Sequence, residues 1–153
     1  MLFPVGSWLI RLVEGTQGSH VALSIELSET HAAFDSVVPV SRVITKARWD
    51  SHYETLREWD LELPKANPSD VMSWILDNTD KRYSRWQCIL LGMGDFFGGW
   101  VRTLVRKQNP NGNEYLICVE AVVRFLMRFA DMKFTRSPDS IGLEEFIGLM
   151  DQK

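Results

Sequence analysis

The sequence predicts one α+β domain, with an antiparallel sheet from the amino-terminal half packed against helices from the carboxy-terminal half. Alternating and β-branched segments fill the first half of the chain, and apolar residues at helical spacing fill the second. The length of 153 residues and the 45% hydrophobic content suit a single core. No internal repeat, linker or low-complexity segment divides the sequence, so the expected domain covers residues 1–153.

The expected strands lie before Pro64 and alternate in hydropathy or are rich in β-branched residues. Leu27–Thr30 is expected to connect two of them as a hairpin, and Pro39 indicates a sheet edge. His20 falls on the face opposite the apolar residues of its strand. The candidate strands are Ser7–Val13, His20–Leu27, His31–Val40, Ser41–Trp49 and Tyr53–Leu63. The expected buried faces include Val21, Leu23 and Ile25 in the second strand and Trp59, Leu61 and Leu63 in the last.

The expected helices follow Pro64. Asn67 is a candidate cap, Pro68 suits a first helical position, and Asp70 complements the helix dipole. Asn109–Asn113 is a polar loop before the third helix. The helical segments are the one that begins at Asn67, then Ser84–Val105, Tyr115–Ala130 and Leu143–Met150. The expected buried stripes are Val71, Met72, Ile75 and Leu76 in the first, and Val122, Phe125, Leu126 and Phe129 in the third.

Composition excludes several classes of function. A net charge of -3 gives no overall attraction to nucleic acid. No run approaches the roughly 20 apolar residues of a transmembrane helix, and no signal peptide is evident, so we expect synthesis in the cytoplasm. Two cysteines, Cys88 and Cys118, give no disulfide framework, and no CxxC or HExxH spacing indicates a metal; we expect no cofactor.

Cys118 is the candidate nucleophile, because it begins a predicted helix where backbone amides and the helix dipole favour a thiolate and can bind an oxyanion. His20, on a strand, is the candidate general base. A third group must orient its imidazole, and His31, Glu26 and Asp35 are all candidates. From spacing alone, a structural cysteine and a structural histidine are the more common interpretation. Zinc bound by His20, His31 and Cys118 is a further alternative.

The segments around these residues resemble circularly permuted papain-like hydrolases related to NlpC/P60. "GSHVALSIE" around His20 resembles their histidine strand, and "YLICVEAVVRFL" around Cys118 resembles their nucleophile helix. The segments "DNTDKRYSRWQCILLGMGDFF" and "SPDSIGLEEFIGLM" are similar to their intervening and closing segments. The order of histidine before cysteine also matches. The resemblance implies Cys118 as nucleophile, His20 as base and His31 as orienting residue.

The resemblance also implies an amide substrate, with peptidoglycan stem peptides as the default. Substrate-binding candidates are Ser19, Glu120 and Trp100. Glu120 is alternatively a helix cap or a solvated carboxylate, and Trp100 alternatively lies in a helix break with buried aromatic residues. Val119 stands where the amidases commonly have Ser. Val119 and Glu120 also depart from the Cys-Glu-His sequence of lecithin:retinol acyltransferase-like enzymes.

Three hypotheses for function follow from the residues and the resemblance. The first is an amide-cleaving cysteine hydrolase of a bacterium or phage. A phage enzyme would be associated with the virion and delivered to the periplasm or cell wall. The second is a catalytically inactive structural subunit of a phage particle, with other virion proteins as partners. The third is acyl transfer or thioester cleavage on a lipid. Cys88 is expected in the core and His52 on the surface.

Overall fold

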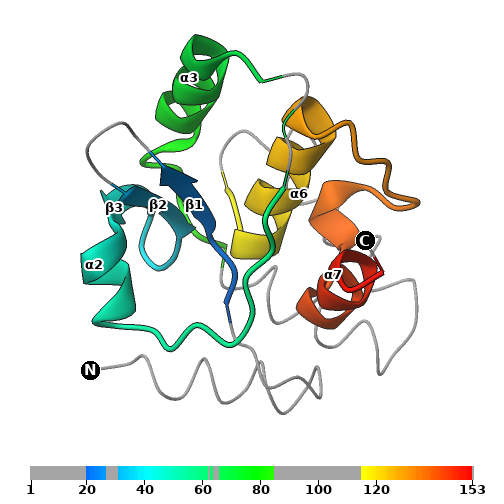
Figure 1. The fold of residues 1–153 in the computed structure, drawn as a ribbon, viewed down its shortest axis with the longest axis horizontal. Coiled ribbons are helices and arrows are strands. Elements are labelled where there is room, and N and C mark those ends of the chain that lie inside the picture. Colours follow the sequence, from blue (N-terminus) through cyan, green and yellow to red (C-terminus); the bar gives the residue numbers. More distant parts are fainter. Residues whose placement is uncertain (1–19, 27–30, 62, 64–65, 85–114, 153) are drawn as a thin grey trace.

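A three-stranded antiparallel sheet and four α-helices form the part of the chain described by the computed structural model, which covers residues 20–26, 31–61, 63, 66–84 and 115–152 (Figure 1). The α+β class predicted from the sequence is therefore confirmed. Four expected features lie wholly or mostly outside the described residues: the Ser7–Val13 strand, the Leu27–Thr30 connection, the Ser84–Val105 helix and the Asn109–Asn113 loop.

The sheet runs in the order β1–β2–β3, with β1 at Leu23–Glu26, β2 at His31–Ser36 and β3 at Ser41–Thr45. In the β1–β2 ladder Leu23 pairs with Phe34 and Glu26 with His31. Leu23 and Phe34 are buried in the core, and Val21 and Ile25 pack against it, so the face expected for this strand is confirmed. The β2–β3 ladder pairs Asp35 with Arg42 and Ser36 with Ser41.

Two strand predictions are wrong. The end of Ser41–Trp49 forms helix α2, Lys46–Asp50, because Thr45 caps it by accepting a hydrogen bond from the Arg48 amide at 3.3 Å. Lys46 and Asp50 add an i,i+4 ion pair of 2.6 Å.

The described part of Tyr53–Leu63 forms no strand and runs from α2 past α6 toward α3 (Figure 1). Asp151, just after α7, holds it through an ion pair with Arg57 and a 3.3 Å hydrogen bond from the Trp59 indole. Trp59 and Leu63 pack against the core, whereas Leu61 is exposed, so the expected shared face is not formed. Side-chain anchoring to α7 replaces strand pairing here.

Helix α3, Pro68–Asn78, begins as its cap predicts, because the Asn67 side chain accepts a hydrogen bond from the Ser69 amide at 3.0 Å.

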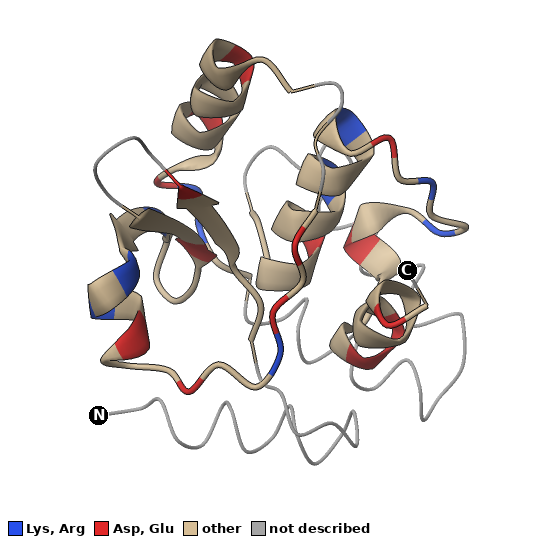
Figure 2. Ribbon diagram, viewed as in Figure 1, with Lys and Arg blue, Asp and Glu red and all other residues tan. Residues whose placement is uncertain are grey.

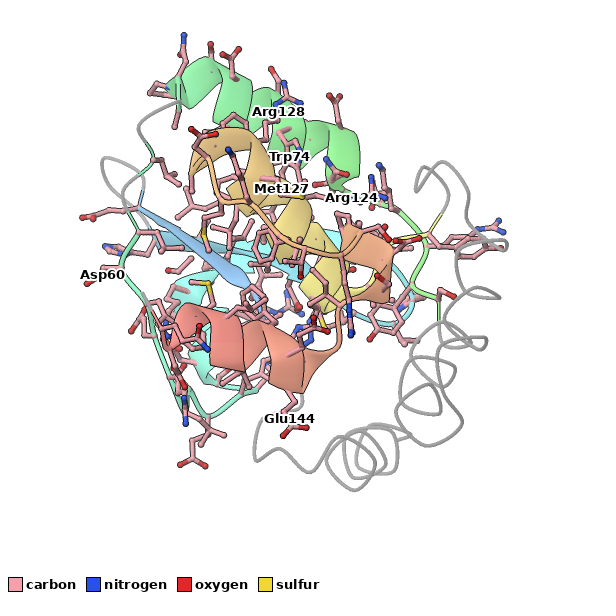
Figure 3. The ribbon with its side chains drawn as sticks, turned by 90° about the vertical axis from the view of Figure 1, so that its right-hand side faces the viewer. Asp60, Trp74, Arg124, Met127, Arg128 and Glu144 are labelled. Carbon is pink, nitrogen blue, oxygen red and sulfur yellow. The ribbon has the colours of Figure 1, made fainter. Side chains whose placement is uncertain are left out.

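The buried face of α3 differs from the predicted one. Ile75 is buried and Val71 packs against the core, but Met72 and Leu76 are exposed, and the buried aromatic residue is Trp74. Trp74 lies between α3 and α6 (Figure 3), 5.2 Å from the Phe125 ring and 5.5 Å from the Phe34 ring between centroids.

Helix α6, Cys118–Phe129, is the centre of the core, and α7, Leu143–Met150, packs beside it. The predicted stripe on α6 is confirmed, because Val122, Phe125, Leu126 and Phe129 are all buried. Met127 and Arg128 lie on the exposed side of the same helix (Figure 3). The Pro138–Ser140 turn of 3₁₀ helix also contacts α6.

The chain segment before α6 is fixed against the sheet. The Ser36 hydroxyl in β2 donates a hydrogen bond of 2.7 Å to the Leu116 carbonyl, and the Leu116 amide donates one of 2.9 Å to the Arg82 carbonyl. Arg82 also forms an isolated antiparallel β-bridge with Val40. Since Leu116 and Ile117 are both buried, these bonds set where α6 begins relative to β2.

Charged residues of both signs are spread over the described elements (Figure 2). Several are paired, as in Arg136 with Glu145 at 2.9 Å and Arg124 with Glu120 at 2.7 Å. Among the residues that the structure describes, none of the helices has the length and apolar character to cross a membrane.

Candidate active site

Cys118 is the first residue of α6 and is almost fully buried, with 6% of its surface exposed. Its place at the helix start agrees with the prediction. The first intrahelical hydrogen bond runs from the Ala121 amide to the Ile117 carbonyl, so the amides of Cys118 and Val119 precede the helical ladder. The Val119 amide, together with that of Val21, hydrogen-bonds to the sulfur.

His20 lies against Cys118, and the two side chains hydrogen-bond to each other. His20 was expected within a strand, but β1 begins three residues later at Leu23, so the imidazole sits on the extended segment that leads into the sheet. Its side chain is 10% exposed. The structure thus brings together the two residues predicted to be nucleophile and base, from positions nearly one hundred residues apart in sequence.

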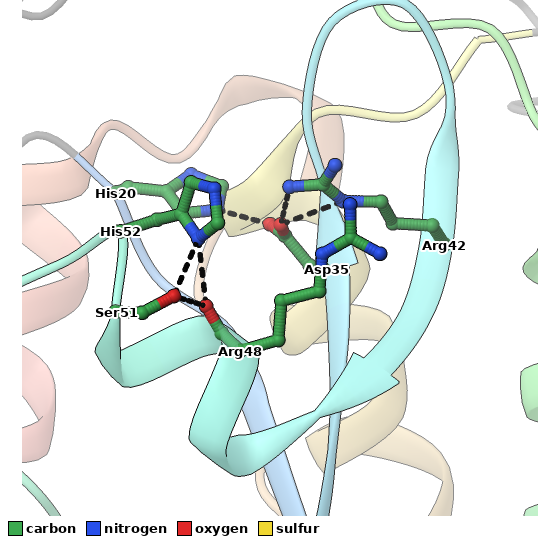
Figure 4. Close-up of polar contacts among 6 residues, drawn as sticks. All are labelled: His20, Asp35, Arg42, Arg48, Ser51 and His52. Carbon is green, nitrogen blue, oxygen red and sulfur yellow. Dashed lines mark hydrogen bonds and ion pairs between the residues drawn. The ribbon is translucent and has the colours of Figure 1, made fainter.

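Asp35 orients the imidazole of His20. Its Oδ1 bonds to Nε2 of the ring (Figure 4). The other ring nitrogen, Nδ1, is therefore left for the hydrogen bond with the thiol. Asp35 follows Phe34, the partner of Leu23 in the ladder, and so lies at the end of the hairpin that His20 approaches. The carboxylate is fully buried, and its Oδ2 accepts hydrogen bonds from Nε and Nη2 of Arg42 at 3.3 and 3.1 Å.

The surroundings of the pair favour a thiolate and an imidazolium. Burial alone lowers the pKa of His20, but the Cys118 charge, the hydrogen bonds to Asp35 and Cys118, and the Asp35 charge raise it to about 9. Burial alone raises the pKa of Cys118, whereas the charge and hydrogen bond of His20 and two backbone amides bring the pKa below its usual value. Each partner therefore stabilises the charged form of the other.

Aromatic rings cover the base. The His20 ring lies 5.4 Å from those of Trp49 and Tyr53 between centroids, and these two stack on each other at 4.3 Å. Burial, followed by the Asp35 charge, raises the pKa of Tyr53. Tyr53 therefore stays a neutral phenol beside the site. Rings packed this closely reduce the access of water to the imidazole, which strengthens its interactions with charged neighbours.

The expectation that His31 lies beside His20 is wrong. His31 pairs across the ladder with Glu26, at the opposite end of β1. Its Nε2 lies 3.8 Å from a Glu26 oxygen, and the two side chains are 59% and 81% exposed. Glu26 is six positions after His20, about 20 Å of extended chain. Neither residue can orient the imidazole, and the described residues do not assemble the zinc site of His20, His31 and Cys118.

Glu120 is not a solvated carboxylate or an open substrate contact. Its side chain is fully buried, and Arg124, one turn later, donates to Oε1 from Nε at 3.0 Å and from Nη2 at 2.7 Å. Burial followed by the charge of Arg124 lowers the pKa of Lys81 nearby, against the opposing effect of Glu120. The carboxylate thus balances basic side chains beside the first turn of α6.

The other candidates divide into two groups. Ser19, Trp100 and Cys88 lie outside the described residues. His52 is exposed, as expected, and its Nδ1 contacts the Ser51 hydroxyl at 2.9 Å and the Arg48 carbonyl at 2.7 Å (Figure 4). Among the described residues, no group of three or more His, Cys, Asp or Glu side chains is arranged to bind a metal ion.

Arg42, Trp49 and Tyr53 were missed by the sequence analysis. Trp49 and Tyr53 fall in the two expected strands that the structure contradicts, and their spacing of four residues is the helical signal that places their rings side by side. Arg42 lies in the expected strand Ser41–Trp49, and the signal for its role is the turn at Val38-Pro39, which sets the register that pairs Arg42 with Asp35. Comparison of the chain with protein-family models, curated proteins and solved structures found no match.

Proposed function

We propose that the protein is a cysteine hydrolase that cleaves an amide bond through an acyl-cysteine intermediate. The observation that carries this proposal is the buried contact of Cys118 with His20, whose ring is held by Asp35. A thiol with a lowered pKa, a base within hydrogen-bonding range and a third group on that base are what nucleophilic catalysis requires. Asp35 replaces His31 as the proposed orienting residue.

The proposed reaction uses these groups in sequence. The Cys118 thiolate attacks the substrate carbonyl carbon, and the amide of Cys118 at the start of α6 is available to the oxyanion. The His20 imidazolium gives its proton to the departing amine as the carbon–nitrogen bond breaks. Neutral His20 then takes a proton from water, whose oxygen attacks the acyl-cysteine. Collapse releases the carboxylic acid and restores the thiolate.

The order of elements supports a permuted papain-like arrangement as part of the same proposal. The base precedes the first strand, the orienting carboxylate lies on the second, and the nucleophile begins a later helix packed against the sheet. We propose peptidoglycan stem peptides as substrate because the segments around His20 and Cys118 resemble enzymes that cleave them. On this proposal, the protein acts at a bacterial cell wall, and a phage virion is one route by which it could be delivered there.

Incubation of the full chain with muropeptides, followed by mass spectrometry of the products, tests the proposal. We expect cleavage of one amide bond, its loss in Cys118→Ala, and its retention in His52→Ala, the matched change of an exposed residue. Cleavage of acyl esters with none of muropeptides would favour the lipid hypothesis. Absence of any turnover, together with full biological function of Cys118→Ala, would favour the structural-subunit hypothesis.

A further inference from the structure

Arg42 contacts the orienting carboxylate from the outer strand of the sheet. Asp35 and Arg42 are direct partners in the β2–β3 ladder, and directly opposed residues place their side chains on the same face. The guanidinium is 38% exposed, whereas Asp35 is fully buried. Arg42 therefore reaches inward from the surface, and its Nε and Nη2 both bond to Oδ2 (Figure 4).

The two oxygens of Asp35 serve different partners. Oδ2 is held by Arg42, and Oδ1 is bonded to Nε2 of His20. A carboxylate fixed at one oxygen can no longer rotate freely, so the direction of the other oxygen is also fixed. That direction decides which ring nitrogen of His20 faces Asp35, and consequently which nitrogen faces the thiol.

We propose that Arg42 is a positioning residue for the base, holding Asp35 so that His20 keeps one ring orientation against Cys118. This inference rests on the proposed function. The described charged and titratable groups that face His20 are Asp35 from β2, Cys118 from α6 and Tyr53 after α2. With Cys118 as thiolate and His20 as imidazolium, Asp35 leaves these groups with one excess negative charge. Arg42 neutralises it.

Loss of the Arg42 charge has a defined consequence for both catalytic groups. An uncompensated negative charge disfavours the thiolate and favours the imidazolium, so Cys118 and His20 should both release their protons at higher pH. A lysine at position 42 would restore the charge without the planar fork that binds one carboxylate with two nitrogens. Charge and orientation can therefore be separated by comparing Arg42→Gln with Arg42→Lys.

The test is the rate of Cys118 alkylation by iodoacetamide as a function of pH, read by mass spectrometry of the Cys118 peptide. In Arg42→Gln we expect the inflection to move up by about half to one pH unit. Arg42→Lys should return it toward the wild-type position. Arg48→Gln is the matched control, since Arg48 is exposed on α2. An unshifted Arg42→Gln profile, or an equal shift in Arg48→Gln, would overturn the proposal.

A second readout covers the case in which Arg42→Gln does not fold. The Nε2 proton of His20, bonded to Asp35, should give a sharp NMR signal in the wild type. It should broaden in Arg42→Lys, and a signal unchanged from wild type would count against the positioning role. A wild-type inflection at the ordinary thiol value would instead contradict the Cys118–His20 pair itself. The failure of the proposed function is thus distinguishable from the failure of this inference.

Discussion

The two ends of the β1–β2 hairpin each hold a histidine beside a carboxylate, yet the two pairs differ in every physical respect. At one end, His20 and Asp35 are 10% and 0% exposed and in hydrogen-bond contact. At the other, His31 and Glu26 are 59% and 81% exposed, with 3.8 Å between their closest charged atoms. The same residue types in one small sheet therefore produce a candidate catalytic base and an ordinary surface contact.

Burial and the number of partners account for the difference. His20 has Asp35 on one nitrogen, the thiol within hydrogen-bonding range and aromatic rings over its face. Water screens the exposed pair of His31 and Glu26, and exposed ion pairs contribute roughly 0–1 kcal/mol to the free energy of unfolding. A histidine and a carboxylate close in space are therefore weak evidence for function. The feature that points to function is the burial of such a pair together with a third reactive group.

The largest expected effect on catalysis comes from substituting the two histidines one at a time. His20→Gln should lower kcat for amide hydrolysis by roughly 10²–10⁴-fold, the usual contribution of a general acid and base. His31→Gln should leave kcat within a factor of about two, since exposed surface changes away from the site have little effect. Steady-state kinetics with a muropeptide substrate measures both. Comparable losses in the two variants would contradict the assignment of the base to His20.

The next effect concerns the carboxylates. Removing one partner of a buried charge pair lowers the free energy of unfolding by roughly 3–5 kcal/mol. Because Arg42 is partly exposed, we expect a loss of about 3 kcal/mol for Asp35→Asn. Glu26→Gln should change the free energy of unfolding by less than about 1 kcal/mol. Denaturant titration at neutral pH gives both values. If Asp35→Asn is as stable as Glu26→Gln, the buried pair does not contribute to folding in the way its geometry implies.

The fold class could be predicted from the sequence because it depends on local patterns, whereas the pairing of Cys118 with His20 was expected from the resemblance of the segments around them. Alternation predicted the face of β1, and the Asn67 cap predicted the start of α3. The polar loop predicted a helix from Tyr115, and α6 begins three residues later at Cys118. The short helix α2 could not be found this way. Its Thr45 cap follows directly on a strand, so period-two and helical patterns overlap within a few residues.

The resemblance favoured His31 over Asp35 as the orienting residue, although the sequence also contained the signal for Asp35. A hairpin connected by Leu27–Thr30 pairs Glu26 with His31, which places His31 at the turn end and Asp35 near the start of β1. Separation along the chain suggested that the two histidines were neighbours, whereas the register shows them at opposite ends. The Trp49 and Tyr53 rings and the Arg42 contact depend on tertiary packing of α2 and β3, which local patterns do not determine.

The smallest expected effect is a change of pH profile, which tests the electrostatic side of the comparison. In the proposed mechanism, activity requires the Cys118 thiolate and the protonated His20. As pH falls, the thiolate takes up a proton at the lowered pKa of Cys118, and this gives the acid limb of kcat/KM. As pH rises through the raised pKa of His20, about 9, the proton needed by the leaving amine is lost. Above that pH, kcat/KM should fall by about tenfold per unit.

The two carboxylates separate the causes of that alkaline limb. Asp35→Asn removes a charge that raises the pKa of His20, while burial continues to lower it, so the limb should move to lower pH. Glu26→Gln should leave the limb in place, because Glu26 contacts His31 at the opposite end of the hairpin. Alkylation of Cys118 should not decline above pH 9, since it needs only the thiolate. A loss of hydrolysis together with a steep rise in Cys118 alkylation would indicate that the protein unfolds at high pH and exposes the buried thiol, rather than that His20 loses its proton.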